Sequence, residues 1–175
     1  MLWHKEGLEN DSLPIILPSI TPKGTEMKIM TEFTIKLAKE RALEEIIKAS
    51  DYAEVNFLVK EGIQKKRLSM RNEVPGEHRI ILLGIDDGIS SQEVLTETRR
   101  IRLDRPTHGD AFLFGEQHPD EQNSGPIVFL HELQYSWSGY SFNLLLDTSR
   151  RGRIISLISS GGWWHSGFRF AFRGR

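Results

Sequence analysis

The residues of this chain whose types and spacing best suit ligand binding are arginines and aromatic residues near its C-terminal end. From Thr148 to Arg175 there are six arginines and no acidic residue, whereas the remaining 147 residues hold 17 basic and 24 acidic side chains. Arginine binds phosphate and carboxylate groups through paired hydrogen bonds, and exposed aromatic rings stack on bases or anchor protein interfaces. The candidate binding residues are therefore Arg150, Arg151, Arg153, Trp163, Trp164, Arg169 and Arg173.

This basic, aromatic segment has three interpretations that the sequence leaves open. In the first, the chain is a small non-enzymatic binding or accessory protein that uses the segment on a protein partner, because a basic patch complements an acidic surface. In the second, the same residues bind single-stranded nucleic acid. In the third, the segment is structural. Phe168, Phe170 and Phe172 then fill a core, and the arginines between them solubilise an edge strand or pair with the acidic body of the chain.

A second group of chemically capable residues lies between positions 108 and 132. Imidazole and carboxylate groups bind zinc, manganese or iron, and a metal with an open position activates water. The sequence therefore allows a metal-dependent hydrolase as a further alternative, with His108, His118 and His131 as metal ligands and Glu132 or Asp110 as the general base.

The same residues also fit structural roles. The three histidines are spaced by ten and thirteen residues, which matches no compact metal motif. Asp110 stands three residues after Thr107, the pattern of a capping box at a helix start, and His118 then lies near the end of that helix. His131 alternates with apolar residues, which favours a hydrogen-bonded position in a core.

Residues 42–74 combine a helical pattern with the segments 49–55 and 68–74. This arrangement resembles the N-terminal domain of the modulator-of-DNA-gyrase type of metallopeptidase, over less than a fifth of the chain. That family binds zinc through two histidines that flank a glutamate on a helix. Here His131-Glu132 has no second histidine after it, so the resemblance implies a helix–strand–strand unit and no activity.

Elements that position these residues follow from hydrophobic periodicity. Apolar residues alternate from Met27 to Leu37, which predicts a half-buried strand, and a helical pattern follows from about residue 38 to 49. Short strands are predicted at 55–59 and within 65–71, and a strand buried on both faces at 79–85. Capping boxes predict helices that begin near Ser90 and Thr107.

The last 50 residues hold four strand patterns separated by short turns, at 127–137, 140–147, 153–159 and 163–172. Short loops between successive strands favour an antiparallel meander. We therefore predict a single α+β domain over residues 25–175. Its largely antiparallel sheet ends in a C-terminal four-stranded meander and packs on one face against two or three helices. Residues 1–24, with prolines at every fourth position from Pro14 to Pro22, are predicted to form a tail.

Composition limits the classes of protein further. The chain has no cysteine, which excludes disulfides, iron–sulfur clusters and a cysteine nucleophile. Its formal net charge of −1 supplies no overall field for nucleic acid or acidic lipid. The apolar run from Leu13 to Ile20 contains two prolines and is far shorter than the roughly 20 residues of a spanning helix. We expect a cytoplasmic protein without a membrane partner or a cofactor.

Overall fold

The computed structural model of this 175-residue chain describes residues 26–37, 41–70, 73–131, 135–137 and 140–175, so the predicted tail lies outside the described residues. The helices are α1 (Leu43–Ala49), α2 (Phe57–Gln64), α3 (Ser91–Arg100), α4 (His108–Gln117) and the short 3-10 helix η1 (Pro119–Ser124). The strands are β1 (Met27–Leu37), β2 (Glu54–Val55), β3 (Gly76–Ile85), β4 (Ile89–Ser90), β5 (Ile127–Phe129), β6 (Tyr135–Trp137), β7 (Tyr140–Ser149), β8 (Gly152–Ser159), β9 (Trp163–Trp164) and β10 (Arg169–Arg173). Within these residues, no helix has the length and apolar character needed to cross a lipid bilayer.

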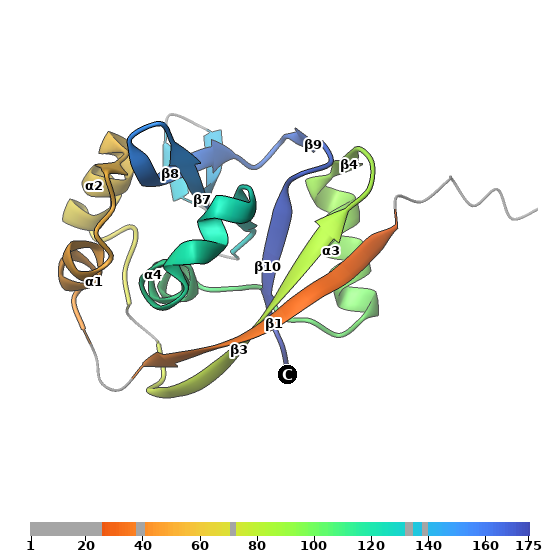
Figure 1. The fold of residues 1–175 in the computed structure, drawn as a ribbon, viewed down its shortest axis with the longest axis horizontal. Coiled ribbons are helices and arrows are strands. Elements are labelled where there is room, and N and C mark those ends of the chain that lie inside the picture. The colour runs from red at the N-terminus through yellow and green to blue at the C-terminus, as the bar shows by residue number, and fades with distance from the viewer. Residues whose placement is uncertain (1–25, 38–40, 71–72, 132–134, 138–139) are drawn as a thin grey trace, which may run out of the picture.

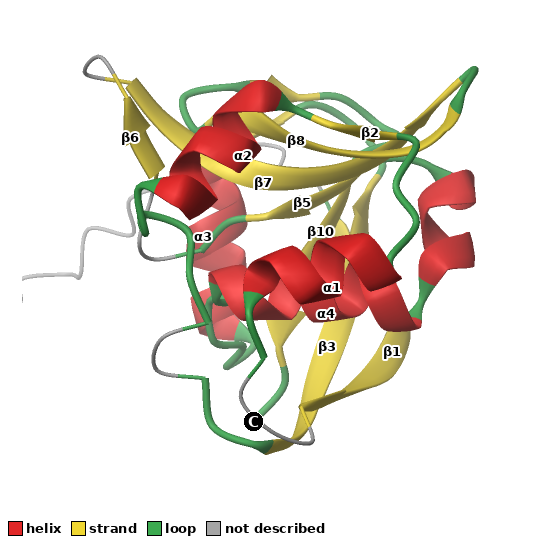
Figure 2. Cartoon of the chain, turned by 90° about the vertical axis from the view of Figure 1, so that its left-hand side faces the viewer, coloured by secondary structure: helices red, strands yellow, loops and turns green. Residues whose placement is uncertain are grey.

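Eight strands form one sheet in the order β1-β3-β10-β5-β7-β8-β2, and β6 also pairs with β7 (Figure 1; Figure 2 labels all eight). All neighbouring strands are antiparallel except β10 with β5 and β2 with β8, which are parallel. The strands β4 and β9 form a separate two-stranded ribbon. The predicted α+β fold with a largely antiparallel sheet is therefore confirmed.

The C-terminal strands confirm the meander and correct the position of its last member. The strands β5 and β6 both pair with β7, and β7 pairs with β8, as short connections predict. The pattern at 163–172, however, divides into β9 and β10. Instead of lying beside β8, β10 lies between β3 and β5, in the middle of the sheet. The edge position considered for this arginine-bearing strand is therefore wrong.

Helices cover both faces of the sheet, and not one face as the sequence predicted. The helices α1, α2 and α4 pack on one face, in a core that includes Ile80 and Leu82 of β3 (Figure 2). On the other face, α3 and the β4–β9 ribbon cover Ile81 and Leu83. In Figure 1, α4 and α3 lie on opposite sides of β3 and β10. This cover on both faces explains why β3 is an uninterrupted apolar run, and it confirms the prediction that this strand is buried on both faces.

The region from residue 54 to 70 differs most from expectation. The strand β2 has only two residues, and the predicted strand at 55–59 is replaced by α2. The side chain of Asn56 caps α2 by accepting a hydrogen bond from the Leu58 backbone N–H at 2.8 Å. Residues 65–70 form no strand, although Leu68 and Met70 are buried in the core. The unit is thus helix–strand–helix, in place of the helix–strand–strand unit that the resemblance implied.

Close packing between α4 and the segment after α1 generates the first testable prediction. A Cβ atom added at Gly115 in α4 would lie 1.8 Å from the buried hydroxyl oxygen of Tyr52, a half-buried residue. Replacing glycine by alanine inside a helix normally stabilises by about 1 kcal/mol. We expect Gly115→Ala to lower the free energy of unfolding instead, by about 1–3 kcal/mol, because the core is overpacked.

The measurement is urea unfolding of purified protein, with Gly161→Ala as the matched control. Gly161 lies in a turn, and no atom lies within 4 Å of its added Cβ, so this variant should unfold like the parent. A Gly115→Ala protein as stable as the parent would show that α4 is not packed this closely.

Candidate functional site

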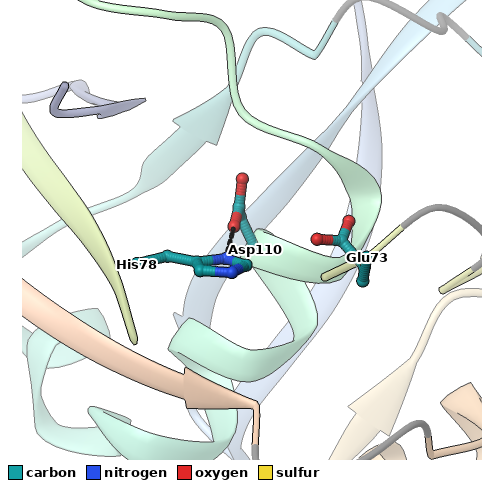
Figure 3. A group of neighbouring side chains, drawn as sticks. All are labelled: Glu73, His78 and Asp110. Carbon is teal, nitrogen blue, oxygen red and sulfur yellow. Dashed lines mark hydrogen bonds and ion pairs between the residues drawn. The ribbon is translucent and has the colours of Figure 1, made fainter. Parts of the chain in front are cut away.

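Glu73, His78, Asp110 and Arg173 form a cluster of titratable side chains at the junction of the sheet with α4 (Figure 3 shows the first three). Glu73 precedes β3, His78 lies on β3, and Asp110 lies in the first turn of α4. Arg173 is the last residue of β10. Because β10 pairs with β3 and α4 packs on the same sheet, segments far apart in sequence deliver these four side chains to one place.

Hydrogen bonds within residues 107–110 hold Asp110 at the start of α4. The Asp110 backbone N–H donates to the Thr107 hydroxyl at 3.2 Å, and the Thr107 backbone N–H donates to the Asp110 carboxylate at 2.7 Å. This is the capping box that the sequence predicts at the start of α4. The Asp110 carboxylate is therefore held at the start of α4, where it can also contact the other side chains of the cluster.

The guanidinium of Arg173 connects the members of the cluster. Its Nε donates to Asp110 Oδ2 at 2.7 Å, and its Nη2 donates to Asp110 Oδ1 at 2.8 Å, which makes a bidentate ion pair. The same Nη2 lies 2.8 Å from Glu73 Oε2 and 3.0 Å from His78 Nδ1. On its other side, His78 donates from Nε2 to the Val74 carbonyl at 2.9 Å.

These contacts shift the proton affinities of the cluster. Burial alone would raise the pKa of Asp110, which has no exposed surface, but hydrogen bonds from His78 and Arg173 outweigh burial and lower that pKa. The hydrogen bond to Asp110 raises the pKa of His78 against the opposing effects of burial and of Arg173. Asp110 therefore stays ionised at neutral pH as the counterion of Arg173.

The cluster also has the ligand atoms of a metal-ion site, but the positively charged guanidinium of Arg173 already occupies it. Glu73, His78 and Asp110 each offer one ligand atom, and these atoms lie within 4.8 Å of one another. The Nη2 atom of Arg173 is within 3.5 Å of all three side chains, so a metal ion would have to displace the guanidinium. We therefore interpret the cluster as an internal ionic anchor for β3, β10 and α4.

The three histidines proposed as metal ligands do not converge. His108 and His118 stand at opposite ends of α4, about 15 Å apart along a helix that rises about 1.5 Å per residue. His108 and His131 are both buried, and their rings meet edge to face at 4.3 Å. His131 Nε2 accepts a hydrogen bond from the Leu144 backbone N–H at 3.2 Å. Glu132, one candidate base, lies outside the described residues.

His118 instead takes part in covering the exposed edge of β1. Its Nε2 donates to the Thr34 carbonyl at 2.9 Å, while its ring packs on Phe33. Beside it, the Gln117 side chain donates to the Lys36 carbonyl at 2.7 Å and accepts from the Lys36 backbone N–H at 2.8 Å. The end of α4 thus satisfies backbone groups that an edge strand otherwise leaves open.

Three of the predicted binding arginines are bound within the chain. Arg173 belongs to the cluster, and Arg169, which is 5% exposed, pairs with Glu121 at 3.0 Å. Arg153 donates to the Ser50 carbonyl at 2.5 Å and to the Gly115 carbonyl, and its guanidinium lies over the Tyr52 ring. The interpretation in which the basic segment pairs with the acidic body is therefore confirmed for Arg169 and Arg173.

The remaining predicted binding residues are not assembled into one surface. Trp164 is buried and donates from its ring N–H to the Ser91 hydroxyl at 2.8 Å, whereas Trp163 is 60% exposed. Arg150 and Arg151 are exposed in the turn before β8, and Trp163 follows the other end of that strand. A strand of eight residues separates them by about 26 Å.

A groove along α1 and α2 is the feature that sequence reasoning missed. It consists of two hollows, of ≈ 530 Å³ and ≈ 250 Å³, which share Glu44, Ile63 and Gln64 as walls. The surface of the smaller hollow is mostly apolar, and its lining includes Ile47, Val55 and Ile63 together with Lys48 and Lys60. The signal that could have found it is the cap at Asn56, since a helix over 57–64 places Ile63 and Lys60 beside α1.

No protein-family model matches this chain, and neither a curated protein nor a solved structure matches it. What the molecule presents is an α+β fold with an internal ionic anchor and an open groove. Its function is therefore inferred from the side chains of these two sites.

The ionic anchor predicts a large difference between two neighbouring arginines. Arg173→Met leaves the buried Asp110 and Glu73 without their counterion, so we expect the free energy of unfolding at neutral pH to fall by about 3–5 kcal/mol. Arg175→Met removes an exposed ion pair with Asp104 and should have a much smaller effect, because solvent screens exposed charges. Urea unfolding measures both.

The acid dependence of this difference follows from the lowered pKa of Asp110. A depressed carboxylate pKa contributes stability above the unfolded value, near 4, and that stability is lost as the pH falls through the folded pKa. The deficit of Arg173→Met should therefore shrink in acid. Equal effects of the two arginine substitutions at neutral pH would refute the anchor.

The raised pKa of His78 predicts that its contribution to stability depends on pH in the opposite direction. Because its folded pKa is raised, protonated His78 contributes stability below about pH 6.5, and the contribution is lost as the pH rises through the folded pKa. The stability gap between the parent and His78→Gln should thus narrow from mildly acidic to mildly alkaline pH. A gap that widens with pH would contradict the assignment.

Proposed function

We propose that this chain is a small non-enzymatic binding protein that holds a segment of a protein partner in the groove along α1 and α2. The observation that carries this proposal is the groove itself, whose apolar floor the described chain leaves uncovered. Grooves between helices take apolar anchor residues of a partner, usually from a helix or an extended segment. Phe57, the first residue of α2, has a 66% exposed aromatic ring one helical turn before Lys60, which lines the groove.

A protein partner is also the first interpretation of the sequence, but the surface proposed to bind it is now the groove and not the C-terminal basic, aromatic segment. Arg153, Arg169 and Arg173 have partners inside the chain, so they offer little to a ligand. Arg150 and Arg151 stay exposed, and their turn adjoins the segment between α1 and β2, because Gly152 lies against Ala53. The proposal takes the cytoplasm as the compartment, with which a cysteine-free composition is compatible.

Single-stranded nucleic acid binding and metal-dependent hydrolysis are the alternatives, and the described residues favour them less. Nucleic acid binding needs basic and aromatic side chains on one surface, but Arg150 and Trp163 lie at opposite ends of β8. Hydrolysis needs converging ligands, but α4 separates His108 from His118. Binding of a protein segment is preferred to these alternatives because the groove is already open in this structure.

Selection from a library of random peptides on the immobilised full-length protein tests the proposal. Selected peptides should bind Ile47→Gln at least about tenfold more weakly than the parent, because a polar group then stands on the apolar floor. Ile101→Gln is the matched control: it removes an exposed isoleucine after α3, on the other face of the sheet, and should leave binding unchanged.

Thermal unfolding of both variants establishes that they are folded before binding is compared. The proposal fails if no peptide is enriched over an empty support, or if enriched peptides bind the parent and Ile47→Gln equally.

A further inference from the structure

The lysines of the described chain fall into two groups. Six lie in the described residues, and three of these pair with carboxylates: Lys28 with Asp86, Lys36 with Glu77 and Lys65 with Glu61. The other three, Lys48, Lys60 and Lys66, are exposed and have no ion pair among the described residues. All three line the groove along α1 and α2. Unpaired lysine is therefore concentrated at the one apolar groove proposed to bind a ligand.

The remaining charges of the groove do not cancel these lysines. Glu44 is the only acidic residue in the lining of the two hollows. The one arginine there, Arg41, is held in a bidentate pair with Glu116, at 2.8 Å for each bond. Three lysines against one glutamate leave the rim with an uncompensated charge of +2, on a chain whose formal net charge is −1. This positive charge is a local property of the groove.

We infer that the segment bound in the groove is an acidic peptide of a protein partner, with Asp or Glu side chains flanking its apolar anchors. This inference rests on the proposed function and specifies its ligand. Apolar anchors fill the floor formed by Ile47, Val55 and Ile63, while acidic flanks reach the ammonium groups at the rim. Charge complementarity of this kind speeds association and rejects basic segments, because like charges repel across the same distance.

The rim lysines also set the character of binding. Exposed charges interact through water and are screened over about 10 Å at ordinary ionic strength. Their contribution must therefore weaken as salt is added, whereas contact between the apolar anchors and the groove floor persists. Acidic peptides should thus lose affinity with salt, and uncharged peptides with the same anchors should not.

Three peptide libraries that share randomised apolar anchors but differ in their flanks test this inference. The flanks are glutamate, glutamine or lysine, and the target is the full-length protein at low salt. We expect glutamate-flanked peptides to bind roughly tenfold more tightly than glutamine-flanked ones and to lose that advantage at high salt, and lysine-flanked ones to bind weakest. The triple variant Lys48→Glu/Lys60→Glu/Lys66→Glu should reverse this order.

A matched control changes the net charge equally, but away from the groove. Arg99→Glu/Arg100→Glu/Arg102→Glu places the same charge change at the end of α3, on the other face of the sheet. It should keep the parent's preference for glutamate flanks. Thermal unfolding confirms that both triple variants are folded.

Each other outcome has a definite meaning. Equal binding of all three flank types, lost in Ile47→Gln, would keep the peptide groove and overturn the acidic ligand. No enrichment from any library would overturn both proposals. Binding of labelled single-stranded DNA that the lysine variant abolishes, without peptide binding, would also overturn both and assign the groove to nucleic acid.

Discussion

The buried ion pair between Arg173 and Asp110 is the constraint on which the arrangement of sheet and helices depends. Asp110 has no exposed surface, and a carboxylate at that depth is costly without its counterion. Arg173 reaches it because β10 runs through the middle of the sheet, and Asp110 faces it because Thr107 caps α4 at that point. With its first turn held there, α4 crosses the sheet and its last residues, Gln117 and His118, cover the edge of β1.

Arginine and lysine side chains occupy different electrostatic environments in this molecule. Three arginines of the C-terminal segment have partners inside the chain: Arg153 binds carbonyl groups near the ends of α1 and α4, Arg169 pairs with Glu121, and Arg173 pairs with Asp110. A guanidinium suits such positions because it is weakly hydrated and forms several fixed hydrogen bonds at once. Lysine is strongly hydrated and stays at the surface, where Lys48, Lys60 and Lys66 surround an apolar floor. The groove along α1 and α2 is therefore surrounded by exposed lysine side chains.

Several elements could be predicted because the interactions that create them are local. The strand β1 has the predicted bounds, and the period-two alternation matches burial at Phe33, Ile35 and Leu37. It fails at Ile29, which is 65% exposed, where the pairing with β3 is interrupted by a shift in register. The starts of α3 and α4 follow from capping boxes whose hydrogen bonds span three residues. The helix α2 was missed because Val55, Phe57 and Val59 also alternate like a strand. Its cap at Asn56 and the pairing of Val59 with Ile63 on one buried helical face decide in favour of a helix.

The amino-acid sequence by itself determined the strands β1, β3, β7 and β8, the starts of α3 and α4, and the opposition between a basic end and an acidic body. Only the tertiary structure decided where that basic end lies and what it binds. The position of β10 depends on pairing between Arg173 and Ile80, more than ninety residues apart, and local periodicity carries no information on such a choice. The same long-range pairing brings Arg173 to His78, Glu73 and Asp110. Which charges are neutralised inside the protein, and which remain exposed, is therefore a property of the folded chain.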